Sequence, residues 1–346
     1  MENQKIRVNM ISSGEDVKGQ GVGSAYFELI RLLQTHAQDR IELSFNDDKD
    51  VMLNHVHTVH PMCYAQMFLS KHPSCMHVHF LPETLEGSIR LPKFAQDAFY
   101  KYFLSMYKAA DAVIVVNPIF IDALAAYGVD RNKITYIPNV VSSEAFYPLK
   151  ERKTRETAEK FGLREDRLTV LGVGQVQTRK GVLDFLEVAR ALPEMQFIWA
   201  GGFSFGNITD GYDELKAAVR EAPENVQFPG IIERDEMNLL YNYADVLLMT
   251  SYNELFPMSV LEAVNAGTAL ILRDLDLYRK IYFAEYLCGD SNRAFVEMLR
   301  GLAKNPEKLA QARAVSAKIQ ADYSEARVAQ LWVDYYTRFA AAHKVI

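Results

Sequence analysis

Residues 245–263 read Asp-Val-Leu-Leu-Met-Thr-Ser-Tyr-Asn-Glu-Leu-Phe-Pro-Met-Ser-Val-Leu-Glu-Ala, and this stretch decides the fold class. The apolar run that ends at residue 251 predicts a buried strand. Pro257 suits the first position of a helix, and Gly267 suits the end of one. A strand that leads through a short loop into a helix is the repeating unit of a parallel sheet.

The same alternation recurs along the chain and predicts an α/β protein. Short runs rich in apolar and β-branched residues predict buried strands at residues 7–11, 51–53, 76–80, 112–116, 134–137, 168–173, 196–200, 226–228, 245–250 and 269–272. The length of 346 residues suggests about two domains. The two series of strands therefore predict two doubly wound, Rossmann-like parallel-sheet domains that face a central cleft.

We place the boundary between these domains in residues 139–150. Residues 1–150 then form the N-terminal domain and residues 151–322 the C-terminal domain. We expect residues 323–346 to form a helix that crosses back to the N-terminal domain. Because ligands bind beyond the carboxyl ends of parallel strands, the loops after the strands are the places where a site is expected.

Composition excludes several classes of protein. With 38 Lys and Arg against 44 Asp and Glu, the net charge of −6 argues against a nucleic-acid binder. Three cysteines without tight spacing fit a reduced cytoplasmic protein and exclude a disulfide framework. The first residues lack the apolar core of a signal peptide, and no apolar run reaches the ~18 residues of a membrane span.

Two glycine-rich loops follow predicted strands. Residues 12–26 contain Gly21 among several glycines, and residues 172–181 end in Arg179-Lys180-Gly181. Glycine lets a backbone approach a phosphate, and a basic pair suits a diphosphate. Neither loop has the dinucleotide or Walker A spacing. The residues alone are equally compatible with a flexible turn in the first loop and a solvated basic turn in the second.

The loop that begins at residue 252 carries two carboxylates near a helix N-terminus. Glu254 precedes the predicted helix and Glu262 lies inside it, while Met258 and Ser259 would present free N–H groups. Such an arrangement suits an anion together with the hydroxyls of a sugar and a ribose. A surface glutamate plus a helix glutamate would give the same spacing.

Six of the eight histidines lie between residues 55 and 79. His55, His57 and His60 are predicted in a loop, whereas His77 and His79 alternate on a strand. No HExxH or His/Cys spacing is present, so we predict no metal site. His79, at a strand end near the cleft, is a candidate for acceptor contact or proton relay, and Glu83 could converge with it.

Residues 90–108 combine basic and aromatic side chains. Arg90, Lys93, Lys101 and Lys108 accompany Phe94 and five further aromatic residues, and one helix face cannot bury all six rings. A basic, aromatic helix suits the interface of an anionic membrane. A helix that packs against the rest of its domain is the alternative.

Taken together, these loops resemble a known family. Glu254 and Glu262 match the E-x7-E pattern of retaining glycosyltransferases of the family-4 type, which have the GT-B fold. Phe256, the Lys180-Gly181 pair and residues 134–139 (Ile-Thr-Tyr-Ile-Pro-Asn) extend the match. Residues 17–26 and 79–84 resemble, more narrowly, the second-step glycolipid synthases of Gram-positive bacteria, which are similar to glucosyl-diacylglycerol galactosyltransferases.

The resemblance implies a role for each site residue. The backbone of Gly21 would lie near the donor diphosphate, and Lys180 would neutralise that diphosphate as it leaves. Glu254 would hold donor-sugar hydroxyls, Glu262 would hold the ribose of UDP, and His79 would lie beside the reacting centre. The remaining donor-binding residues would be Gln175, Arg179, Phe256, Met258 and Ser259.

The implied activity is hexose transfer, with galactose expected, from UDP-hexose to a glucosyl-diacylglycerol. The N-terminal domain would bind the acceptor and the inner face of the cell membrane, and the C-terminal domain would bind the nucleotide sugar. No metal or cofactor would be needed. Glucosyl transfer to a lipid or a soluble acceptor, an inactive UDP-sugar-binding subunit and a nucleotide-sugar epimerase remain alternatives.

Two residues depart from the family pattern. Gln175 stands where an arginine is usual, so that either Arg179 compensates or the donor binds more weakly. Pro257 stands where a glycine is usual, which would alter the turn beside the sugar.

Overall fold

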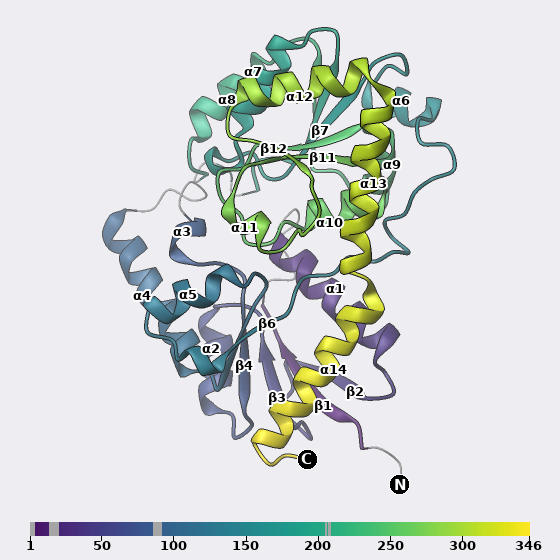
Figure 1. Ribbon diagram of the computed structural model, residues 1–346. Coiled ribbons are helices and arrows are strands. Elements are labelled where there is room, and N and C mark those ends of the chain that lie inside the picture. The colour runs from purple at the N-terminus through teal and green to yellow at the C-terminus, as the bar shows by residue number, and fades with distance from the viewer. Residues whose placement is uncertain (1–3, 14–20, 86–91, 205, 207–208) are drawn as a thin grey trace.

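The computed structural model describes residues 4–13, 21–85, 92–204, 206 and 209–346. It contains two six-stranded sheets, with the strand orders β2-β1-β3-β4-β5-β6 and β12-β11-β10-β7-β8-β9 (Figure 1). Every neighbouring pair of strands runs parallel. The predicted α/β class with two doubly wound sheets is confirmed.

The first sheet and its helices occupy the chain up to residue 136. Its strands are β1 (Ile6–Ile11), β2 (Ile41–Phe45), β3 (Leu53–Val56), β4 (Ser74–Val78), β5 (Ala112–Val115) and β6 (Ile134–Tyr136). The helices between them are α1 (Gly21–His36), α2 (Pro61–Leu69), α3 (Pro82–Leu85), α4 (Lys93–Ala109), α5 (Ile119–Ala126) and the short η1 (Arg131–Lys133).

The second sheet repeats this arrangement. Its strands are β7 (Thr169–Val173), β8 (Gln196–Ala200), β9 (Val226–Gly230), β10 (Val246–Met249), β11 (Ala269–Arg273) and β12 (Leu287–Gly289). Its helices are α6 (Arg155–Phe161), η2 (Thr178–Lys180), α7 (Val182–Ala191), α8 (Tyr212–Arg220), α9 (Arg234–Tyr243), α10 (Met258–Asn265), α11 (Asp276–Arg279), α12 (Asn292–Lys304) and α13 (Pro306–Asp322).

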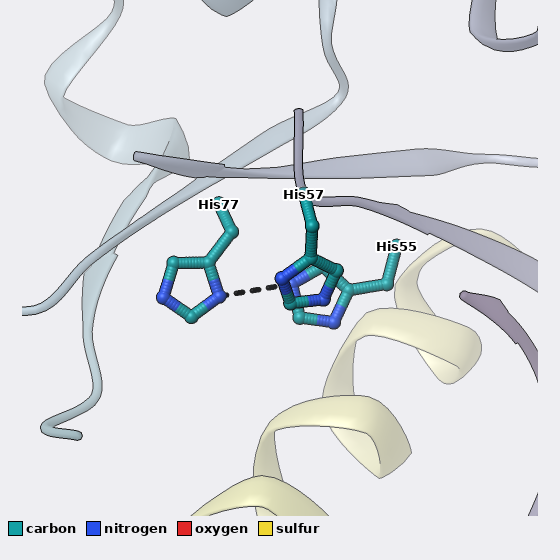
Figure 2. A group of neighbouring side chains, drawn as sticks. All are labelled: His55, His57 and His77. Atoms are coloured by element: carbon teal, nitrogen blue, oxygen red, sulfur yellow. Dashed lines mark hydrogen bonds between the residues drawn. The ribbon is translucent and has the colours of Figure 1, made fainter. Parts of the chain in front are cut away.

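Two predicted strands were misplaced, and this changes the position of two histidines. The strand predicted at residues 76–80 is β4, Ser74–Val78, so His79 follows the strand and does not lie on it. The prediction of a strand at residues 51–53 was wrong, because β3 covers Leu53–Val56 and includes Asn54 and His55. These polar residues interrupt the apolar run that guided the prediction, yet both are fully buried in the strand. His55 therefore lies in β3 and not in a loop, and Figure 2 shows its ring close to those of His57 and His77.

The last helix, α14 (Glu325–Ala342), lies across the first sheet (Figure 1). Its buried residues Val328, Trp332 and Tyr336 recur every fourth position and form one stripe. That stripe shares a core cluster with Val8 of β1 and Leu29 of α1. The chain thus leaves the second sheet through α13 and ends against the first.

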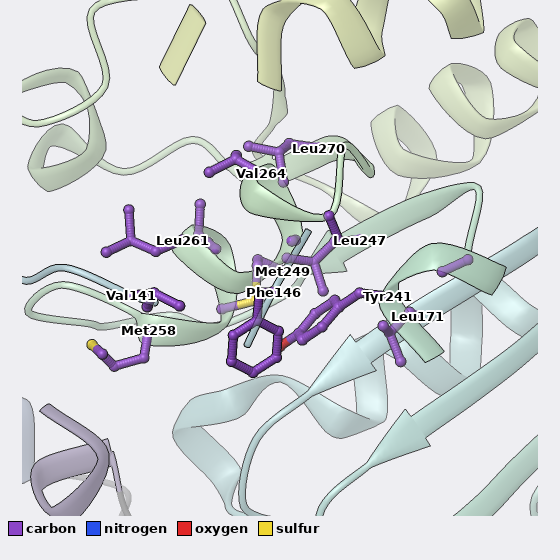
Figure 3. Packing of buried hydrophobic residues seen from close by; sticks show 14 of the residues in the cluster. Val141, Phe146, Leu171, Tyr241, Leu247, Met249, Met258, Leu261, Val264 and Leu270 are labelled. Atoms are coloured by element: carbon purple, nitrogen blue, oxygen red, sulfur yellow. The ribbon is translucent and has the colours of Figure 1, made fainter. Parts of the chain in front are cut away.

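A second core lies beneath α10 (Figure 3). Met258, Leu261 and Val264 recur at helical spacing and pack with Leu247 and Met249 of β10. This packing fixes the N-terminus of α10 close to the carboxyl end of β10, where Glu254 lies. Within the described residues, no helix combines the length and the apolar composition that a membrane span requires.

Candidate active site

Gly181 lets the loop after β7 press against the end of β10. Its φ of +67° lies in the left-handed region, and a Cβ placed there would meet Thr250 O at 2.2 Å. The Thr250 hydroxyl donates to Lys180 O at 3.0 Å, and Tyr252 N donates to Arg179 O at 2.8 Å. The absence of a side chain at Gly181 therefore brings the basic pair beside the loop that carries Glu254.

Lys180 and Glu254 form a buried ion pair at this junction. The Lys180 ammonium donates to Glu254 Oε1, and Glu254 is only 6% exposed. Arg179 Nη1 lies 3.6 Å from Glu254 Oε2 and donates to Asn253 O at 3.0 Å. Two cations beside one carboxylate leave a surplus of positive charge, which suits a diphosphate.

The surroundings shift the pKa values of both partners. Burial acts to raise the pKa of Glu254, but the charges of Lys180 and Arg179 outweigh it, and the net pKa is lowered. Burial lowers the pKa of Lys180 more than the attraction of Glu254 raises it. Glu254 is therefore ionised at neutral pH and can accept hydrogen bonds from hydroxyls.

Helix α10 starts directly after this loop. Pro257 is the N-cap residue, with φ −71° and ψ 120°, and Met258 is the first helical residue. The predicted helix start was therefore one residue early. The N–H groups of the first helical residues have no partner within a helix. Met258 and Ser259 are the first two residues of α10, so their N–H groups suit an anion.

Glu262 lies on α10 one turn further along. Its carboxylate accepts a hydrogen bond of 2.7 Å from the Tyr241 hydroxyl of α9. Burial raises the pKa of Glu262, although the Arg234 charge and the Tyr241 hydrogen bond lower it. Sequence reasoning missed Tyr241, because no spacing signal connects α9 with Glu262.

The other predicted donor residues lie on three separate segments. Gly21 is the first residue of α1, which follows β1. Gln175 follows β7, and its side-chain oxygen accepts from the Gln177 amide. Phe256 is buried against Tyr282 and Tyr323, with ring centroids 5.9 and 5.3 Å away, so its ring supports the loop from within the core.

His79 directly follows β4. Its Nε2 lies 3.4 Å from His57 Nδ1, and burial lowers its pKa to about 4. No hydrogen bond or ion pair among the described residues joins His79 to Lys180 or Glu254. The Glu83 carboxylate accepts from the Tyr127 hydroxyl, and the suggested convergence of His79 with Glu83 stays a prediction.

Two asparagines join the domains beside the site, and sequence reasoning missed both. Asn117, after β5, is fully buried and donates to Leu255 O at 3.2 Å and to Leu277 O at 3.0 Å. Asn253 donates to Glu83 O at 2.9 Å. The position of Asn117 just after a predicted strand is the signal that could have identified it.

Part of the basic aromatic segment forms α4, away from this cluster. Lys93, Lys101 and Lys108 are exposed, and Phe94 is 79% exposed. Arg90 lies outside the described residues. The other aromatic side chains are half-buried or buried, namely Phe99, Tyr100, Tyr102, Phe103 and Tyr107. The prediction that some of the rings are exposed is confirmed by Phe94.

Comparison with known proteins identifies the family. Residues 153–318 match the model for glycosyl transferases group 1, and residues 18–145 match glycosyltransferase family 4. The chain is 41% identical over 343 residues to the alpha-galactosylglucosyldiacylglycerol synthase of Streptococcus pneumoniae, covering 99% of this chain and 92% of that protein. The chain belongs to the family 4 glycosyltransferases.

More distant relatives share parts of this sequence and its fold. The processive diacylglycerol alpha-glucosyltransferase of Acholeplasma laidlawii is 26% identical over 287 residues, which cover 82% of this chain and 83% of that protein. Among solved structures, sucrose-phosphate synthase from Thermosynechococcus elongatus gives a TM-score of 0.78 at 17% identity, covering 98% of this chain and 100% of that one. The fold of this family 4 glycosyltransferase is GT-B.

Proposed function

We propose that this glycosyltransferase moves a hexose, with galactose favoured, from a UDP-hexose to a glucosyl-diacylglycerol and so makes a diglycosyl-diacylglycerol. The observation that carries the proposal is the buried cluster of Lys180, Arg179 and Glu254 at the N-terminus of α10. The names of the similar proteins from S. pneumoniae and A. laidlawii support the acceptor class.

In this proposal the cluster stabilises the departing UDP. The bond between the anomeric carbon and the diphosphate oxygen breaks, so negative charge grows on the diphosphate. Lys180, Arg179 and the N–H groups of Met258 and Ser259 offset that charge in a site largely closed to water. We assign the backbone N–H of Gly21, the first residue of α1, to the same diphosphate, because the start of a helix favours an anion.

The carboxylates hold the two sugars of the donor. Glu254 is ionised and accepts from hydroxyls of the hexose, while Glu262 accepts from the ribose and is held by Tyr241. Phe256 supports this loop from the core, and Gln175 is held by the side-chain amide of Gln177. Arg179, which lies 3.6 Å from Glu254, supplies in this proposal the cationic contact with the diphosphate that Gln175 cannot make.

The acceptor approaches from the N-terminal domain in the proposed reaction. His79 is neutral at physiological pH because its pKa is lowered, so a ring nitrogen can accept a hydrogen bond from the acceptor hydroxyl. The reaction retains the anomeric configuration, and a diphosphate oxygen helps to deprotonate the acceptor. No metal ion or cofactor takes part at the donor site.

We also propose that α2 and α4 form the surface that meets an anionic membrane from the inner, cytoplasmic side. These helices pack together, with the Tyr64 and Tyr102 ring centroids 5.9 Å apart. On α2, Phe68 and Leu69 are 75% and 78% exposed, and Phe94 of α4 is equally exposed. Apolar side chains flanked by lysines suit the boundary between lipid headgroups and acyl chains.

A product screen tests the proposed function. Purified protein is incubated with UDP-galactose, UDP-glucose or UDP-N-acetylglucosamine and vesicles of diacylglycerol or glucosyl-diacylglycerol, and the lipid products are identified by mass spectrometry. We expect addition of one hexose to glucosyl-diacylglycerol, with UDP-galactose giving the most product. If UDP-glucose alone gives product, the transferred hexose is glucose and not galactose. The absence of a lipid product with every donor would contradict the proposal.

A further inference from the structure

Four histidines line one face of the N-terminal sheet. Side chains two residues apart on a strand share a face, so His55 and His57 lie together at β3, and His77 and His79 at β4. Val56 pairs with Met76 in the register of these strands, which sets the two pairs of rings side by side. His55, His57 and His77 are each less than 5% exposed.

Three of these rings present nitrogens to one another. One ring nitrogen from each of His55, His57 and His77 lies within 4.8 Å of the other two, as Figure 2 illustrates. His77 Nδ1 and His55 Nε2 are 3.3 Å apart. In a tetrahedral zinc site, with bonds of about 2.0–2.1 Å, two ligand nitrogens lie roughly 3.3 Å apart. The pair of His55 and His77 therefore has the spacing of metal ligands, and the His57 nitrogen, within 4.8 Å of both, would have to move closer by a side-chain rotation to complete it.

Two of the rings have nitrogens that the surrounding protein does not satisfy. Among the described residues, His57 Nε2 and His77 Nε2 are buried and have no hydrogen-bond partner. Buried polar atoms almost always have a partner, so such atoms call for an explanation. A lone pair directed at a metal ion would satisfy His57 Nε2, whereas His77 presents its other ring nitrogen, Nδ1, to His55.

The third ring is held in the way that metal-bound histidines are held. His55 Nδ1 lies 2.7 Å from the Tyr336 hydroxyl of α14. If Nδ1–H donates to this oxygen, the tautomer is fixed and Nε2 keeps its lone pair for a metal. Trp332 of the same helix covers the cluster, with its ring 5.2 Å from that of His55.

We propose that His55, His57 and His77 bind one divalent transition-metal ion beneath α14. Zinc is the best match, because neutral imidazoles at this spacing suit a tetrahedral site, and three protein ligands leave a fourth position for water. The ion would join β3 to β4 and, through Tyr336, to the last helix. This site is separate from the donor cluster of Lys180 and Glu254, and its role is to stabilise the N-terminal domain.

The direct test is metal binding by the full-length protein. Protein stripped with a chelator is titrated with Zn²⁺ in the presence of a chromophoric competitor, and with Co²⁺ as a spectroscopic probe. We expect one equivalent per chain and the intense visible absorption of tetrahedral Co²⁺. The variant His77→Gln should lose this equivalent, whereas the control His72→Gln, which changes a histidine outside the cluster, should keep it.

Two further measurements distinguish the loss of a metal ligand from a failure of the variant to fold. Circular dichroism shows whether His77→Gln is folded, and Zn²⁺ should raise the Tm of the wild type and of His72→Gln but not that of His77→Gln. If His77→Gln does not fold, X-ray absorption of the Zn²⁺-loaded wild type decides, with three imidazole nitrogens expected. Absence of the equivalent in the wild type, or its retention in a folded His77→Gln, overturns the proposal and leaves a stack of hydrogen-bonded neutral rings.

Discussion

At the scale of single residues, Gly181 controls whether the donor cluster assembles. The variant Gly181→Ala places a Cβ against Thr250 O and adds about 1–3 kcal/mol of strain from the positive φ. We expect a loss of stability in urea unfolding beyond that strain, together with a large fall in kcat/KM, because Lys180 is displaced from Glu254.

The control for this substitution is Gly230→Ala. Gly230 has a φ of +83°, but among the described residues no atom lies within 4 Å of the point that an alanine Cβ would occupy. It therefore carries the backbone strain without the collision. Equal losses of stability and activity in the two variants would show that the contact with Thr250 is not what matters.

Protonation of Glu262 should raise the KM for the UDP-hexose donor at acidic pH. Burial raises the pKa of Glu262 above the ordinary 4.5, so this carboxylate takes up a proton on acidification while Glu254, with a lowered pKa, stays ionised. Loss of the ionised acceptor corresponds to about 1.5–3 kcal/mol, or roughly ten- to a hundredfold in KM. The measurement is KM for UDP-hexose against pH. In Glu262→Gln the KM should be high and should no longer rise as Glu262 would take up its proton. A variant whose KM rises at acidic pH as in the wild type would contradict the proposed role of Glu262.

The donor residues could be predicted individually but not as a cluster. Lys180 and Glu254 each follow a strand that the apolar pattern identified, so their place at one sheet edge followed from parallel topology. The ion pair itself depends on Gly181 meeting Thr250, a contact between distant segments that no local pattern encodes. Tyr241 was missed for the same reason.

At the scale of elements, the loop after β5 supports the loop after β10. Asn117 is fully buried, donates to the carbonyls of Leu255 and Leu277, and accepts from Ile119 N at 3.1 Å. The variant Asn117→Ala leaves these groups unpaired, at about 1–3 kcal/mol for each buried group. We expect lower stability in urea and a lower kcat, since Leu255 is adjacent to Glu254.

The control for this substitution is Asn253→Ala. Asn253 is partly exposed and loses only one contact, to Glu83 O, so this variant should lose less stability and less activity than Asn117→Ala. A larger loss in Asn253→Ala than in Asn117→Ala would contradict the role given to Asn117.

The proposed membrane surface of α2 and α4 can be tested with one pair of aromatic residues. Burying one Phe side chain in lipid is worth about 1.5–3 kcal/mol, so Phe68→Ser should weaken flotation with anionic vesicles roughly tenfold or more. Phe283→Ser is the matched control, because Phe283 is also 75% exposed but belongs to the second domain. Equal flotation of the two variants would contradict the assignment of this surface.

Elements were predictable where they are apolar and continuous. The buried strands β8 and β11 were found almost to the residue, whereas β2 and β12 were missed. β2 is an edge strand with polar Glu42 and Ser44, and β12 has only three residues, so neither forms a buried apolar run. The position of β3 was wrong because buried polar side chains interrupt its pattern.

At the scale of the whole molecule, the two sheets meet through polar contacts that surround the donor cluster. Besides Asn117 and Asn253, the buried Glu28 of α1 pairs with Arg234 of α9 and accepts from Ser142 N at 3.0 Å. The chain has a net charge of −6, yet two cations, Arg179 and Lys180, lie together where a diphosphate is proposed to bind. Overall charge argued against a nucleic-acid binder but could not locate this site.

The most direct test of the account is the rate of hexose transfer to lipid in Lys180→Ala. Radiolabelled UDP-galactose and vesicles of glucosyl-diacylglycerol are used, and Lys160→Ala serves as the control, since it removes an exposed lysine paired with Glu236. We expect Lys180→Ala to remain folded but to lose about 10²–10³-fold in rate, whereas Lys160→Ala should keep the rate of the wild type. Transfer by Lys180→Ala at the rate of the wild type would contradict it.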